Sequence, residues 1–257
     1  MKIAITGKGG VGKTTLSALL SHLYALEGKK VIAVDADPDA NLAAALGVSK
    51  EKLEKLRPIA EIPELIEERT GAKAGTIGGV FKLNPKVDDI PEGFGCKIDG
   101  ITLLIMGKSK TASSGCYCPE NALLKRLLKH LIVEREEVVI VDMEAGIEHL
   151  TRGTTEGVDA FIIVVEPGQR SIQTALTVKK LAEELGVKKV FVSANKIRNN
   201  DDILFIKKAI GDIEFIGAMS FNDEIMEADI KGLPSYAASL KAVEEAKEIK
   251  KRLEEII

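Results

Sequence analysis

The 257-residue chain has no tryptophan and only 4% aromatic residues, so it offers few rings on which nucleic-acid bases could stack. Its 36 basic and 39 acidic residues nearly balance, which argues against the basic face that nucleic-acid binding needs. Its aliphatic runs are short, as in Val138–Val141 and Ile162–Val165, and none is long enough to span a bilayer. We therefore expect neither a nucleic acid nor a membrane as partner.

Cysteine is also scarce. The three cysteines, Cys96, Cys116 and Cys118, are too few and odd in number for a disulfide scaffold, and they suit a reducing compartment. The first residues run from a strand-like segment directly into glycines, without the apolar core or cleavage site of a secretory signal. We expect a cytoplasmic protein that folds without disulfides or structural metal, because a chain of this length buries about 70–75% of its unfolded surface.

Short apolar segments alternate with amphipathic helical segments along the chain. Val138–Val141 and Phe161–Val165 are apolar at every position, which is typical of strands covered on both faces. The alternation predicts an α/β fold, a doubly wound and mostly parallel sheet with helices on both faces. We expect strands at 3–6, 31–34, 101–106, 138–142, 160–165, 190–194 and 215–219, and helices near 14–27, 120–133, 170–185, 202–210 and 236–256.

Residues 49–100 interrupt this alternation with charged helix-like pieces and a stretch rich in glycine, proline and aspartate. This stretch has too few apolar residues for a core of its own. We therefore expect one domain over residues 1–257 with an insertion at about 49–100. An extra hairpin around Gly79–Leu83 is an alternative description of part of it.

The segment GKGGVGKTT at residues 7–15 follows the first expected strand, opens the first expected helix and matches the pattern G-x-x-x-x-G-K-[ST]. In such a loop, successive backbone N–H groups form an anion-binding nest, and the helix N-terminus adds positive potential. Lys13 can reach β- and γ-phosphates, and the Thr14 hydroxyl can bind Mg²⁺. The pattern predicts a nucleoside triphosphate site that includes Gly9, Gly10, Val11, Gly12, Lys13, Thr14 and Thr15.

Acidic side chains follow two strands at the same expected edge of the sheet. Asp35, Asp37 and Asp39 come after the second strand, and Asp142 ends the strand at 138–142. Carboxylates beside bound phosphates would repel them unless they hold Mg²⁺ or orient water. Asp142 ends a buried strand, where an unpaired carboxylate is costly, so a role near Mg²⁺ is expected for it. We expect Asp35 to lie deeper, near the threonines of the phosphate loop, and Asp39 has no clear assignment.

Asn195 and Lys196 follow the strand at 190–194 at this edge. Guanine-binding proteins that share this kind of phosphate loop carry an aspartate at the position of Arg198, and that aspartate accepts hydrogen bonds from the base. A guanidinium group cannot accept a hydrogen bond. The sequence therefore favours adenine, and hence ATP and ADP.

The segment GCYCPEN at residues 115–121 follows a long loop, and long loops in compact domains are usually functional. Pro119 suits the first turn of a helix, so Cys118 falls near the helix N-terminus, where the dipole favours the thiolate. Two thiolates cannot complete a tetrahedral four-sulfur site, but two chains of a dimer can supply four, which suits Zn²⁺, Ni²⁺ or an iron–sulfur cluster. Thiols without metal and a redox pair remain alternatives at this point.

Lys8 within KGGVGKTT resembles the second lysine of the deviant phosphate loop in the MinD/ParA/nitrogenase-iron-protein class of dimeric ATPases. In that class this lysine reaches the nucleotide of the partner chain. The resemblance implies catalytic roles for Lys8, Lys13 and Asp37, with Asp37 activating water. It also implies switch positions at Asn41 and Gly146, where the Gly146 backbone meets the γ-phosphate, and a base contact at Asn195 beside Lys196.

The segments KGGVGKTT, DADPDAN, GCYCPENALL, DMEAGIEHLTRGT, EP and NK together resemble the CooC-type accessory ATPases of nickel carbon-monoxide dehydrogenase, over essentially the whole chain. The resemblance implies an ATP-dependent homodimer that binds Ni²⁺ or Zn²⁺ through Cys116 and Cys118 of both chains. It also implies nickel delivery to the carbon-monoxide dehydrogenase apoenzyme. Cys96 matches no motif, and we expect a structural role for it.

Two other functions remain as alternatives. A positioning or partition ATPase bound to membranes carries a basic amphipathic C-terminal helix. Residues 237–257 instead hold five basic and five acidic residues with a spaced apolar face, which indicates a helix docked on the core. An electron carrier similar to the nitrogenase iron protein would need a cluster held by the Cys-x-Cys pairs alone, because no cysteine follows Cys118.

Overall fold

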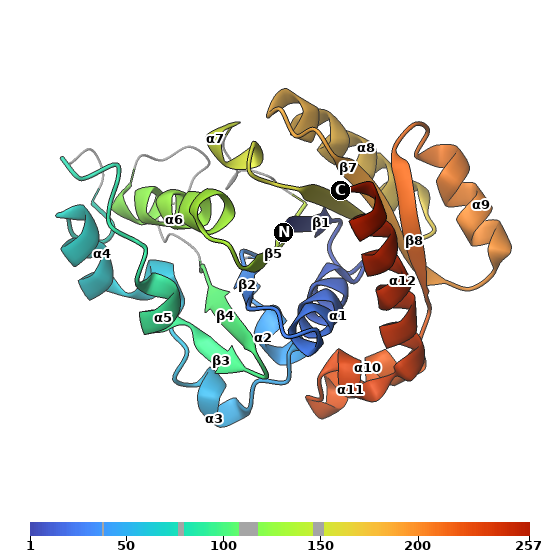
Figure 1. Ribbon diagram of the computed structural model, residues 1–257, viewed down its shortest axis with the longest axis horizontal. Coiled ribbons are helices and arrows are strands. Elements are labelled where there is room, and N and C mark those ends of the chain that lie inside the picture. The colour runs from blue at the N-terminus through green and yellow to red at the C-terminus, as the bar shows by residue number, and fades with distance from the viewer. Residues whose placement is uncertain (38, 77–79, 108–117, 146–151) are drawn as a thin grey trace.

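The computed structural model describes residues 1–37, 39–76, 80–107, 118–145 and 152–257 (Figure 1). These residues form an eight-stranded sheet in the order β3-β4-β2-β5-β1-β6-β7-β8. Every neighbouring pair is parallel except β3 and β4, which confirms the predicted α/β fold. The strands are β1 (Lys2–Gly7), β2 (Val31–Asp35), β3 (Cys96–Ile98), β4 (Ile101–Ile105), β5 (Val138–Asp142), β6 (Ala160–Val165), β7 (Val190–Ile197) and β8 (Glu214–Ser220).

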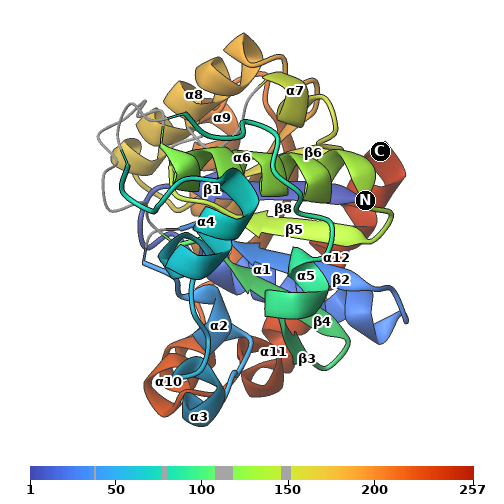
Figure 2. The same cartoon turned by 90° about the vertical axis from the view of Figure 1, so that its left-hand side faces the viewer.

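Helices cover both faces of the sheet (Figures 1 and 2). Side chains of a strand alternate between faces, so in β1 Ile3 and Ile5 pack with α1 and α12, whereas Ala4 packs with α6 and α8. The helices are α1 (Lys13–Leu26), α2 (Leu42–Ala45), α3 (Lys50–Leu53), α4 (Pro63–Thr70), α5 (Ile90–Phe94), α6 (Pro119–Lys129), α7 (Arg152–Thr155), α8 (Gln169–Glu184), α9 (Asn200–Ala209), α10 (Asp223–Lys231), α11 (Ser235–Ala238) and α12 (Leu240–Ile256), with a 3₁₀ turn at Ile59–Glu61 and a π-helical turn at His130–Glu134.

The insertion packs into the same core as the rest of the chain. Ile59, Ile66 and Ile90 share one buried cluster with Leu123 and Leu127 of α6. This contact explains why a stretch with few apolar residues is ordered without a core of its own.

The hairpin in this region is not at the expected place. Residues 80–83 form no strand, and Gly79 lies outside the described residues. The hairpin is instead formed by β3 and β4, joined at Asp99 and Gly100, both of which have positive φ. An Asp-Gly pair suits a two-residue turn of this kind, so the sequence does carry a signal for the hairpin at this position.

The C-terminal helix α12 docks on the sheet. Ala242, Ala246, Ile249 and Leu253 are buried against β8 and α1, whereas Leu240 at the start of the helix is 84% exposed. No helix in the described part of the chain is long and apolar enough to cross a membrane.

Candidate nucleotide-binding site

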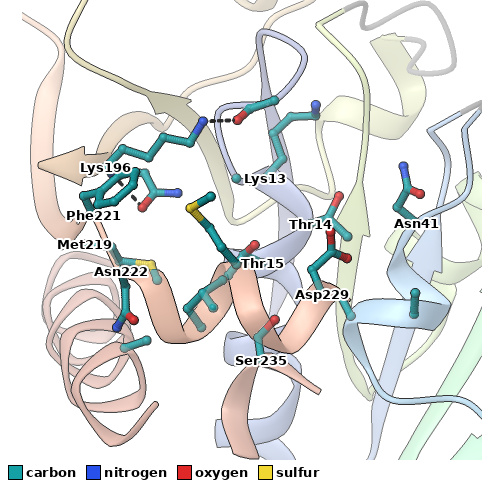
Figure 3. A pocket seen from close by; sticks show the side chains of 18 of the residues that line it. Lys13, Thr14, Thr15, Asn41, Lys196, Met219, Phe221, Asn222, Asp229 and Ser235 are labelled. Atoms are coloured by element: carbon teal, nitrogen blue, oxygen red, sulfur yellow. Dashed lines mark hydrogen bonds between the residues drawn. The ribbon is translucent and has the colours of Figure 1, made fainter. Parts of the chain in front are cut away.

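A cavity of about 640 Å³ opens at the carboxyl ends of the parallel strands (Figure 3). The loop between β1 and α1 forms one wall, and the segment from the end of β8 through α10 and α11 forms the opposite wall. Ligands of open α/β sheets bind at this edge. The predicted residues Gly9, Gly10, Gly12, Lys13, Thr14, Thr15, Asp37, Asn195 and Lys196 all line the cavity, as do Asp39 and Asn41.

The phosphate loop has the backbone shape that its glycines predict. Gly10 has a φ of 79° and Gly12 a φ of 96°, which disfavour any residue with a side chain. A Cβ on Gly12 would also lie 2.0 Å from the amide nitrogen of Asn195. The Val11 side chain is fully buried in the core, so this residue can offer a ligand only its backbone.

Lys13 and Asp37 meet in the cavity. The Lys13 ammonium is 3.7 Å from a carboxylate oxygen of Asp37, and the two side chains are 6% and 17% exposed. The second Asp37 oxygen accepts a hydrogen bond from the Asp39 backbone N–H. Asp37 therefore lies in the cavity beside the lysine of the phosphate loop.

Thr14 and Asp142 form the second pair. The Thr14 hydroxyl donates a 2.7 Å hydrogen bond to Oδ2 of Asp142, while Oδ1 is buried without a hydrogen-bond partner among the described residues. Burial raises the pKa of Asp142 to about 6, although the bond from Thr14 and the charge of Lys13 lower it. An orphaned carboxylate oxygen beside a threonine hydroxyl is an arrangement that fits Mg²⁺.

Asp35 lies beside Asp142, because the two residues are Cα partners in neighbouring strands. Burial raises its pKa to about 7. Its carboxylate accepts hydrogen bonds from the backbone N–H groups of Leu42, at 2.8 Å, and Asp37. It thus shapes the loop that carries Asp37, whereas the hydroxyl of Thr14, which we expected near Asp35, donates to Asp142 instead.

Asn195 and Lys196 both contact the phosphate loop. The Asn195 amide donates to the Val11 carbonyl at 2.8 Å. The Lys196 ammonium donates to the Gly10 carbonyl at 2.6 Å (Figure 3). Lys196 also pairs with Glu166 at 3.0 Å. These contacts support the loop itself, a role that the sequence pattern did not predict for either residue.

The end of the cavity away from Lys13 is formed by residues that sequence reasoning missed: Met219, Phe221, Asn222, Ile225, Met226 and Leu233. Figure 3 shows Met219 and Phe221 across the cavity from Thr14. All of these side chains except that of Asn222 are apolar, and an apolar surface suits a flat aromatic base. Arg198 does not line the cavity, and its guanidinium lies over the Phe221 ring, 5.0 Å from the ring centre.

The remaining predicted residues lie partly outside the described structure. Lys8 is half-buried and forms no ion pair with any described residue. Gly146 and Cys116 lie outside the described residues, and Cys118 is buried directly before α6. Within the described part of the chain, no three His, Cys, Asp or Glu side chains gather as a metal site.

Comparison with known proteins gives a consistent picture. The sequence-family model of the CobQ/CobB/MinD/ParA nucleotide binding domain matches residues 2–235. The carbon monoxide dehydrogenase accessory protein CooC of Rhodospirillum rubrum is 50% identical, covering 93% of this chain and 90% of that protein. An uncharacterized ATP-binding protein of Methanocaldococcus jannaschii is 48% identical over all of this chain and 98% of its own length.

Solved structures show the same fold. The septum site-determining protein MinD of Pyrococcus horikoshii, complexed with Mg-ADP, superimposes with a TM-score of 0.66 at 18% identity, covering 100% of this chain and 96% of that one. The parallel sheet, the phosphate loop at its edge and the sequence matches agree with one another. The chain therefore belongs to the CobQ/CobB/MinD/ParA nucleotide-binding family and, within it, to the CooC-type ATPases of the MinD/ParA class.

Proposed function

We propose that this protein dimerises around Mg·ATP, hydrolyses it, binds Ni²⁺ or Zn²⁺ between its two chains and assists nickel insertion into carbon-monoxide dehydrogenase. The proposal that the protein binds and hydrolyses Mg·ATP rests on two contacts at one edge of the sheet. Lys13 pairs with Asp37, and Thr14 donates a hydrogen bond to Asp142. The 50% identity to CooC supports the metal-delivery part, because that protein is named as an accessory of carbon monoxide dehydrogenase.

Lys13 and Asp37 supply the chemistry of hydrolysis. A triphosphate competes with Asp37 for the Lys13 ammonium, since phosphate oxygens are strong, charged acceptors. Asp37 is then free to accept a hydrogen bond from water beside the γ-phosphate. Attack of that water on phosphorus breaks the bond to the bridging oxygen and yields ADP and inorganic phosphate.

Thr14 and Asp142 are the residues that would hold Mg²⁺, Thr14 by its hydroxyl and Asp142 by orienting that hydroxyl and the water around the ion. Their fit rests on the orphaned Oδ1 of Asp142, which lies at the end of β5 with no described partner. Bound there, Mg²⁺ neutralises phosphate charge. Asn195 and the apolar side chains line the part of the cavity that adenine would occupy in this proposal, with ATP as the substrate.

Lys8 links nucleotide binding to dimerisation in this proposal. It stands in the phosphate loop, and within the described part of the chain its ammonium forms no ion pair, so it is available to phosphates bound by a second chain. ATP then favours the closed dimer through its extra affinity for that state. Loss of the γ-phosphate, and of its contact with the Gly146 backbone, opens the dimer again.

The cysteines couple this cycle to the metal cargo. Cys118 lies directly before α6. Closure brings Cys116 and Cys118 of both chains together as four soft ligands for Ni²⁺ or Zn²⁺. Opening after hydrolysis releases the ion to the client enzyme.

Native mass spectrometry with a non-hydrolysable ATP analogue and added Ni²⁺ or Zn²⁺ tests this proposal. We expect a dimer that carries two nucleotides and metal held by four thiolates. The Cys116→Ser variant should keep the nucleotides and lose the metal, whereas Cys96→Ser in β3 serves as the control and should keep both. Metal uptake by a single chain, or uptake that ignores the nucleotide, would contradict the coupling.

A further inference from the structure

Two consecutive residues at the end of β7 hold two consecutive carbonyl groups of the phosphate loop. The Asn195 amide donates to the Val11 carbonyl, and the Lys196 ammonium donates to the Gly10 carbonyl. We call Asn195, Lys196 and the Glu166 carboxylate that pairs with Lys196 the loop clamp.

A regular strand could not build this clamp, because its successive side chains point to opposite faces. The pairing of β7 with β8 shifts register between Ala194 and Ile197, and Lys196 has a φ of +57°. This is a backbone conformation that residues other than glycine adopt rarely. The irregularity turns both side chains toward the same loop, as bulges beside functional sites often do.

Holding the two carbonyls also orients two N–H groups. In a trans peptide, the C=O and the following N–H point in opposite directions within one plane. The bond from Lys196 to the Gly10 carbonyl therefore sets the direction of the Val11 N–H. The bond from Asn195 to the Val11 carbonyl sets that of the Gly12 N–H, a group of the kind that a phosphate loop turns toward its ligand.

Glu166 follows β6 and is itself held in place, since its backbone N–H donates to the Ser171 hydroxyl at 3.1 Å. Its carboxylate lies 3.0 Å from the Lys196 ammonium, and the side chain is 28% exposed. Without this partner, the ammonium could leave the Gly10 carbonyl for solvent or for a bound phosphate. The carboxylate thus keeps the ammonium on the Gly10 carbonyl.

We infer that Glu166 is a positioning residue that acts through Lys196 to hold the phosphate loop in its phosphate-binding shape. This inference rests on the proposed nucleotide site. Lys196 then contributes to binding of the phosphates rather than of the base. Glu166 contributes to nucleotide binding without contacting the nucleotide itself.

The experiment compares Glu166→Gln, Lys196→Met and the double variant by the dissociation constants of Mg·ATP, Mg·GTP and base-free tripolyphosphate. Glu166→Gln should weaken all three by about 10-fold, the size expected for loss of one charge-assisted hydrogen bond, and leave the ATP-to-GTP ratio unchanged. The double variant should bind no more weakly than Lys196→Met, because Glu166 acts through Lys196. Asp212→Asn, which breaks an exposed ion pair with Lys179, is the control and should bind as the wild type does.

Several results would overturn the inference. These are unchanged affinities in Glu166→Gln, an altered ATP-to-GTP ratio, and additive losses in the double variant. If Glu166→Gln does not fold, Lys196→Met carries the same comparison of nucleotides with tripolyphosphate. A wild-type chain that binds no nucleotide would refute the proposed function as well, whereas wild-type binding with an unaffected Glu166→Gln variant refutes the clamp alone.

Discussion

Replacement of Asp142 by asparagine should stabilise the nucleotide-free protein while disabling its site. The Asp142 carboxyl is fully buried at the end of β5, and burial raises its pKa from 3.8 to about 6. At pH 7 the folded chain must ionise this group, which costs about 3 kcal/mol relative to the unfolded chain. Asparagine keeps an oxygen for the Thr14 hydroxyl and removes the charge.

The sign of the pH dependence follows from these values. Below pH 4 the carboxyl is protonated in both states, so Asp142→Asn should change the free energy of unfolding little. Between pH 4 and about 6 the unfolded chain gives up the proton more readily than the folded chain, so wild-type stability falls relative to the variant. Above the folded pKa the variant should be more stable by about 2–3 kcal/mol.

Urea unfolding followed by circular dichroism measures this difference, since the chain has no tryptophan for fluorescence. The free energy of unfolding is compared at pH 4 and pH 8 for the wild type, Asp142→Asn and the exposed control Asp212→Asn. Equal stabilities at pH 8, or a difference that does not depend on pH, would refute the argument from burial. The variant should also lose the effect of Mg²⁺ on ATP binding, which calorimetry detects.

Three further variants test the remaining roles. Lys13→Ala should lower ATP affinity at least 100-fold, because the ammonium is the buried cation of the site; titration calorimetry that finds normal affinity would contradict its role. Asp37→Asn should bind ATP but release phosphate about 100-fold more slowly in a steady-state assay, and normal turnover would assign water activation to another residue. Lys8→Ala should bind ATP as a monomer and fail to dimerise in light scattering with an ATP analogue, whereas an intact ATP-dependent dimer would exclude the lysine as the link between chains.

The sequence by itself determined most of the framework. Strand segments that are apolar at every position, such as residues 138–141 of β5 and all of β6, predicted a sheet covered on both faces, because a strand buried on both faces has no polar side. The phosphate loop could also be identified from the sequence, because its glycines, lysine and threonines lie in one short continuous segment. Asp37 and Asp142 could be assigned to the same edge, because parallel strands place their carboxyl ends together.

The tertiary structure decided what joins segments that are distant in the chain. The register shift in β7 turns Asn195 and Lys196 onto carbonyls of residues 184 and 186 positions earlier, and Glu166 comes from the end of a third strand. The apolar end of the cavity, with Met219 and Phe221, depends on where β8 ends and α10 begins beside the phosphate loop. The hydrophobic pattern and the helix and strand propensities indicate only how each segment is buried. The contacts described here depend on which segments lie side by side, and packing of the whole sheet determines that arrangement.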